Sequence, residues 1–180
     1  MSTAIATCLA LMRRYQVAVM DPTITLLEVH KLMYFMQEAG EPLRLQYEKA
    51  PYGPYAETLR HVLNHIEGHF ISGYGDAEDR PDVPLELKPH AAEVAEAFLL
   101  GQADTHQHFD RVAELIKGFE TPYSMELLAT VHWVATREQA TTPEAAVKKV
   151  HAWNTRKQQM FTPHHIELAQ QRLQKAGWIA

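Results

Sequence analysis

The chain has a single cysteine, Cys8, so it cannot form an internal disulfide. A lone cysteine is typical of proteins kept in a reducing compartment. The sequence also lacks an apolar run long enough to span a membrane, because Arg13 and Arg14 interrupt the apolar residues near the N-terminus. No small-residue cleavage site follows that segment. We therefore expect an amphipathic first helix and a cytoplasmic protein.

Sequence motifs of catalysis and cofactor binding are missing as well. The chain contains no G-x-S-x-G elbow, no P-loop and no G-x-G-x-x-G motif. Cys8 lies in an apolar helical pattern, which favours a core residue over a nucleophile. These absences predict a protein that is not an enzyme and that uses no cofactor.

What is present is ordinary globular composition with an uneven charge. Hydrophobic residues make up 46% and charged residues 22% of 180 residues, which favours a single domain over residues 1–180. Residues 1–136 carry 19 acidic against 10 basic side chains, whereas residues 137–180 carry 3 against 7. A basic protein partner is therefore expected for the larger, acidic part, and a polyphosphate is not.

Apolar periodicity predicts a mostly helical protein. Helices are expected over residues 3–19 and 25–39, the second opened by a capping box of Thr25 and Glu28. Residues 43–48 alternate as a short strand does, and residues 69–73 are its expected partner. Pro54 is expected to open a helix, and residues 74–89 to form a loop. Further helices are predicted at 90–101, 105–118, 122–138, 143–158 and 163–176. The fold class is thus α-rich with a two-stranded ribbon and a winged-helix-like C-terminal helical unit.

One histidine pair has the spacing of metal ligands. His61 and His65 stand four residues apart on a predicted helix, and Glu57 precedes them by four more, so the three share one face. The glutamate lies outside the pair, unlike the H-E-x-x-H motif of zinc peptidases. A solvated helix face is the expected interpretation, and a metal-dependent enzyme remains a distant alternative.

Two neighbouring segments carry the features of a binding surface. In the turn Tyr52-Gly53-Pro54-Tyr55, two aromatic rings flank a turn pair, which suits either stacking contacts or the locking of a strand to a helix. The loop after it is acidic and follows Tyr74, expected to be exposed. Spaced carboxylates and rings of this kind resemble a nucleic-acid strand to a basic groove. The candidate partner-binding residues are Tyr52, Gly53, Pro54, Tyr55, Tyr74, Asp76, Glu78, Asp79 and Asp82.

The C-terminal third suggests a different role. Its predicted helices have the order of a helix-turn-helix or winged-helix unit, and its charge is basic. The last helix nevertheless lacks the dense basic stripe of DNA-binding proteins. A DNA-binding transcriptional regulator is therefore the alternative to a protein-binding role.

Several segments spread over most of the chain carry a resemblance to known proteins: 31–43, 52–56, 59–64, 66–69, 72–76, 109–112, 118–120 and 126–134. Together these segments resemble one family, the C-terminal domain of DarG-type macrodomain antitoxins from DarT–DarG pairs. The K-L-x-Y-F and Y-G-P-Y patterns are also distantly similar to SocA-like (Panacea) antitoxin domains.

The resemblance implies a function in that setting. In the family, DarT is an NAD-using ADP-ribosyltransferase that modifies bases of single-stranded DNA. A macrodomain of the antitoxin removes the modification, and the C-terminal domain binds the toxin. Since this chain contains no macrodomain pattern, the resemblance implies an antitoxin domain that blocks a DarT-like toxin, by occupying its DNA groove as a DNA mimic. On this hypothesis the partner is the toxin, with no membrane, small-molecule substrate or direct nucleic-acid binding.

Overall fold

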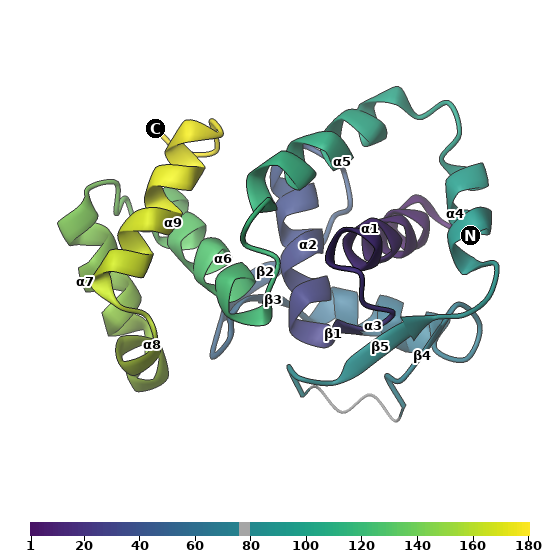
Figure 1. The fold of residues 1–180 in the computed structure, drawn as a ribbon, viewed down its shortest axis with the longest axis horizontal. Helices are drawn as coiled ribbons and strands as arrows, with labels where there is room; N and C mark the ends of the chain where they lie inside the picture. The colour runs from purple at the N-terminus through teal and green to yellow at the C-terminus, as the bar shows by residue number, and fades with distance from the viewer. Residues whose placement is uncertain (76–79) are drawn as a thin grey trace.

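A computed structural model describes residues 1–75 and 80–180 of the chain. The fold is mostly helical with a small two-stranded sheet, as predicted, and it has a three-stranded sheet in addition (Figure 1). Among the described residues, no helix is both long and apolar enough to cross a membrane. The elements in chain order are α1 Thr3–Val19, β1 Ile24–Thr25, α2 Leu26–Glu38, β2 Tyr47–Ala50, β3 Gly53–Ala56, α3 Glu57–Ile66, β4 Ile71–Ser72, β5 Pro84–Leu87, α4 Ala91–Phe98, α5 Ala103–Ile116, α6 Pro122–Arg137, α7 Pro143–Trp153, α8 Thr155–Met160 and α9 Pro163–Lys175.

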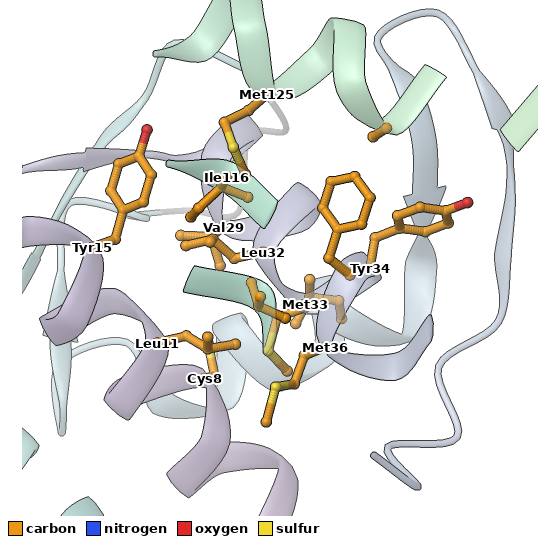
Figure 2. Packing of buried hydrophobic residues seen from close by; sticks show 14 of the residues in the cluster. Cys8, Leu11, Tyr15, Val29, Leu32, Met33, Tyr34, Met36, Ile116 and Met125 are labelled. Carbon is orange, nitrogen blue, oxygen red and sulfur yellow. The ribbon is translucent and has the colours of Figure 1, made fainter. Parts of the chain in front are cut away.

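Helix α2 is the central element of the core. Its predicted capping box is confirmed, because the Glu28 amide donates to the Thr25 hydroxyl and the Thr25 amide donates to the Glu28 carboxylate. Every residue from 26 to 36 is buried, so the helix is covered on all sides. Figure 2 shows its core-facing side chains among residues of α1, α5 and α6. The labelled neighbours from those three helices include Cys8, Leu11, Ile116 and Met125.

The first β-hairpin differs from the predicted ribbon. Strand β2 pairs antiparallel with β3, and Tyr47 lies opposite Ala56 at one end of the register. The segment 53–56, predicted to be a turn and the start of a helix, is therefore a strand, and α3 begins only at Glu57. Backbone pairing with β2 overrides the local preference of Pro54 for a helix start.

The central strand of the second sheet, β5, lies in the segment 74–89 that was expected to be a loop. Strand β5 pairs with β1 on one side and with β4 on the other, both antiparallel. The prediction that residues 69–73 pair with residues 43–48 is wrong, because Ile71 lies opposite Leu87 instead. These strands are short, and their apolar residues Ile24, Ile71 and Leu85 are buried, so core packing places them.

The C-terminal unit consists of helices alone in residues 122–180, all of which the structure describes. Helix α6 packs against α2 on one side and against α7 and α9 on the other, which joins the C-terminal helices to the rest of the fold (Figure 1). The single helix predicted over 143–158 is broken at Asn154. This residue ends α7, and its side chain accepts a hydrogen bond from the Lys157 amide to cap α8.

Candidate functional site

A cavity of about 370 Å³ opens between the first half of α2 and the turn of the β2–β3 hairpin. Its size is within the range of about 300–1,000 Å³ that is usual for ligand pockets. Most of the lining is apolar or aromatic, with two nitrogen-bearing side chains among it. The lining residues are Leu26, Leu27, His30, Lys31, Ala50, Pro51, Tyr52, Tyr55 and Pro81.

Helix α2 supplies the two nitrogen-bearing groups of the cavity. His30 is 3% and Lys31 2% exposed, so both side chains are almost completely shielded from solvent. The His30 ring stacks on Tyr55, with ring centroids 4.7 Å apart and planes inclined by 20°. Neither ring nitrogen of His30 has a hydrogen-bond partner among the described residues. The Lys31 ammonium donates to the Pro54 carbonyl at 2.8 Å, which ties α2 to β3.

Gly53 allows the hairpin to approach α2 this closely. Its φ of +102° belongs to a region that side-chain-bearing residues rarely adopt. A Cβ atom at this position would lie 3.2 Å from the Thr130 hydroxyl and 3.4 Å from the Lys31 ammonium. Glycine is therefore favoured here by its backbone conformation and by the limited space.

The junction between α7 and α8 holds the tip of the hairpin. The Trp153 indole donates to the Ala50 carbonyl at 2.8 Å, and the Asn154 amide donates to the Pro51 carbonyl at 3.0 Å. These bonds link residues about a hundred positions apart in sequence. They fix one wall of the cavity from the C-terminal helices.

A group of charged side chains stands behind that wall. The Arg156 guanidinium carbon lies 4.5 Å from the centre of the Tyr52 ring, an arrangement typical of a cation–π contact. Arg156 also donates two hydrogen bonds to Glu126, at 2.7 and 3.0 Å. The fully buried Lys157 ammonium donates to the same carboxylate. With Lys31, three basic side chains face a single carboxylate.

Burial and mutual repulsion weaken the basicity of these amines. The pKa of Lys31 is lowered to about 7, mainly by burial and to a smaller extent by the charges of Lys157 and Arg156, against the opposing effect of Glu126. Burial likewise lowers the pKa of Lys157 to about 8, again against Glu126. The pKa of His30 falls to about 3 through burial and the charge of Lys31. The site thus holds a neutral imidazole and amines that an anion would help to protonate.

The structure divides the residues predicted to form a binding surface. Tyr52 and Tyr55 line the cavity, and Gly53 and Pro54 shape the strand behind it. Asp82 is exposed and follows the lining residue Pro81. The residues Asp76, Glu78 and Asp79 lie outside the described residues.

Tyr74 was expected to be exposed, and that prediction is wrong. Its side chain is 2% exposed and belongs to the hydrophobic core. The backbone amide of Tyr74 donates to the Glu67 carboxylate, which turns the chain so that the ring points inward. Tyr74 is thus a residue of the hydrophobic core and not part of an exposed surface of the acidic loop.

The metal alternative finds no geometric support. Among the described residues, no group of three His, Cys, Asp or Glu side chains could hold a metal ion together. Glu57, the proposed third ligand, instead pairs with Arg60 at 2.7 Å and accepts from the Tyr55 hydroxyl at 3.1 Å. These contacts lower the pKa of Glu57, the Arg60 hydrogen bond most.

Sequence reasoning missed the polar groups that distinguish this cavity. His30 and Lys31 stand in the otherwise apolar run from Val29 to Met36, and that contrast was the available signal. The sequence around Glu126 and Lys157 offers no comparable contrast, because both polar and apolar residues surround each of them. Only the packing of α6 against α8 brings them together.

Comparison with known proteins relates the chain to proteins named DNA ADP-ribosyl glycohydrolase. No family model matches the chain. A protein of Thermus aquaticus named DNA ADP-ribosyl glycohydrolase is 44% identical over 151 residues, which cover 84% of this chain and 41% of the relative. Proteins of the same name from Mycobacterium bovis and Mycobacterium tuberculosis are 38% identical over 180 residues, covering 93% of this chain and 51% of each relative. The chain spans about half the length of the curated relatives it matches.

These names correct several predictions from the sequence. The three relatives are named as glycohydrolases, and none as an antitoxin domain or a transcriptional regulator. The assignment to a DarG-type antitoxin domain, the inhibition of a toxin and the regulator alternative are therefore corrected. Three further expectations are corrected as well. They are that the protein is not an enzyme, that its partner is a toxin, and that it binds neither a nucleic acid nor a small-molecule substrate. The sequence motifs considered belong to other enzyme classes, so their absence does not exclude a glycohydrolase.

Proposed function

We propose that this chain takes part in the hydrolytic removal of ADP-ribose from DNA, and that its cavity binds the modified nucleotide. The name shared by relatives at 38–44% identity supports the reaction. The observation that supports the binding site is the cavity itself. Aromatic side chains and Lys31 line it, and Arg156 lies against the ring of the lining residue Tyr52.

The chemistry of the cavity suits the parts of such a substrate. An ADP-ribosylated nucleotide has flat bases and a pyrophosphate. Tyrosine rings and proline faces bind flat bases by stacking. Phosphate oxygens are bound by arginine and lysine, and the excess of basic groups over Glu126 leaves positive charge for them. The overall acidity of residues 1–136 does not prevent this, since local charge decides at a partly buried site.

Two further features belong to the same proposal. We place the whole of residues 1–180 in one domain, since α6 packs against both α2 and the C-terminal helices. We also place the protein in the cytoplasm, where its DNA substrate would be and where the buried free thiol of Cys8 would stay reduced.

The test uses a single-stranded oligonucleotide carrying ADP-ribose on one base, with the unmodified strand as control. Binding is measured by fluorescence anisotropy and release of ADP-ribose by chromatography. We expect the modified strand to bind more tightly than the control strand. Arg156→Gln should weaken that binding about tenfold or more, by loss of a charged contact. Arg13→Gln, which changes an exposed arginine of α1, is the matched control. Equal binding of both strands, with no release of ADP-ribose, would refute the proposal.

A further inference from the structure

Among the described residues that line the cavity, His30 is the only one with buried side-chain polar atoms that lack a hydrogen-bond partner. Other buried polar atoms without partners belong to Thr7, Thr130 and Trp178, and these do not line the cavity. A buried polar group without a hydrogen bond destabilises a fold, so folded proteins keep few of them. Such a group at a ligand cavity indicates a partner that arrives from outside.

The surroundings of His30 fix its ring and leave both of its nitrogens buried and without a hydrogen-bond partner among the described residues. Tyr55 covers one face of the imidazole in a near-parallel stack. The carbonyl of His30 accepts a hydrogen bond from the Tyr47 hydroxyl at 3.0 Å, which anchors the backbone at this point. The ring is thus held by stacking and by its backbone, whereas its nitrogens contribute nothing to the fold.

We infer that His30 hydrogen-bonds the ligand of the cavity, and that the group it binds is a nucleobase. The inference rests on the proposed function and identifies the residue that recognises the base. A neutral imidazole offers one N–H donor and one lone-pair acceptor. Nucleobases carry neighbouring donors and acceptors on their edges. Tyr52 and Tyr55 supply stacking surfaces on the same wall. The low pKa of His30 keeps the imidazole neutral at physiological pH, which preserves its acceptor.

The proposal predicts opposite effects on folding and on binding. His30→Leu removes the unpaired nitrogens, so the thermal midpoint of the free protein should stay the same or rise. The same variant should bind the ADP-ribosylated oligonucleotide about tenfold more weakly, for loss of a hydrogen bond. His30→Gln keeps a donor and an acceptor and should recover part of the affinity. As control, His132→Leu removes a buried histidine bonded to the Tyr34 hydroxyl outside the cavity. It should lower the thermal midpoint and leave the affinity unchanged.

A purely structural role of His30 would give the reverse pattern. The inference is wrong if His30→Leu lowers the thermal midpoint and binds the modified strand with wild-type affinity. If the wild-type chain does not bind that strand, the proposed function fails, and adenosine and thymidine become the probes. Either nucleoside should then shift the ¹⁵N signals of the His30 ring in histidine-labelled protein. Unchanged ring signals at saturating nucleoside would overturn the inference on its own.

Discussion

Glu126 on α6 accepts two hydrogen bonds from Arg156 on α8, at 2.7 and 3.0 Å. The same carboxylate, 1% exposed, also receives the ammonium of the fully buried Lys157. This single acidic side chain thus holds two basic ones next to the cavity wall. Its removal would leave Lys157 as a buried charge without a counterion.

Glu126→Gln is therefore expected to destabilise the protein strongly. Breaking a buried ion pair by removing one partner costs about 3–5 kcal/mol. The lower part of that range is expected here, because the Arg156 side chain is 41% exposed and can turn to water. Urea unfolding measures the free energy of unfolding. Glu167→Gln, at an exposed position of α9, is the control and should change it by less than about 0.5 kcal/mol. A similar small change for Glu126→Gln would contradict the prediction.

Acid should destabilise the fold through its buried histidines. Burial lowers the pKa of His30 and of His132 to about 3, with smaller effects of neighbouring positive charges. The unfolded chain, in which histidine has a pKa of about 6.5, binds more protons between these values. The stability contributed by the neutral imidazoles is therefore complete above pH 6.5 and is lost as the pH falls toward 3.

Each of the two histidines should cost about 2 kcal/mol at pH 5, from about 1.4 kcal/mol per pKa unit. The measurement is urea unfolding at several pH values from 4.5 to 7.5. His30→Leu should remove about one proton from the pH dependence and flatten the curve. An unchanged slope in that variant would show that His30 takes up its proton in the folded state as easily as in the unfolded chain.

The fold was predictable where local sequence signals agree with packing. Thr25 and Glu28 mark the start of α2 in sequence, and the structure forms that capping box. At Pro54 the local signal and the tertiary structure disagree. Proline is suited to a helix start, but β2 offers a partner strand, and pairing delays the helix to Glu57.

The cavity was only partly predictable. Tyr52 and Tyr55 were found because aromatic residues around a Gly-Pro turn are unusual in a sequence. Their partners come from α2 and from the α7–α8 junction, about a hundred residues later. No periodicity or spacing relates these segments, since the contacts depend on how α6 packs against α2 and α8. The sequence does not mark His30 as a binding residue, because a single histidine in a buried helix most often belongs to the core.

Gly53→Ala should reduce both stability and binding. The φ of +102° strains any residue with a side chain, and the 3.2 Å approach to the Thr130 hydroxyl requires a shift of a few tenths of an ångström for a methyl group to fit. A loss of about 1–3 kcal/mol is expected for a side chain forced into this backbone region. Gly68→Ala is the matched control, because Gly68 also has a positive φ but no atom within 4 Å of an added Cβ.

The difference between the two glycine variants isolates the packing effect. Gly68→Ala should show only the cost of the backbone conformation and should bind the modified oligonucleotide normally. Gly53→Ala should in addition weaken that binding, because it displaces Pro54 and with it the contact to Lys31. Equal losses of stability in the two variants, with equal binding, would show that the close approach at Gly53 is unimportant.

Lys31 should make ligand binding depend on pH near neutrality. With a pKa of about 7, this buried amine is close to half protonated at pH 7 in the free protein. A bound phosphate favours the ammonium, so binding is accompanied by proton uptake. The affinity for ADP-ribosylated oligonucleotide should therefore be highest below pH 7 and fall as the pH rises from 7 to 9.

Titration calorimetry in buffers of different ionisation enthalpy measures the proton uptake directly. Lys31→Met should bind more weakly and lose most of that uptake between pH 7 and 8, whereas Lys148→Met, at an exposed position of α7, should retain it. Undiminished proton uptake in Lys31→Met would assign the pH dependence to another group, of which Lys157, with a pKa of about 8, is the nearest candidate.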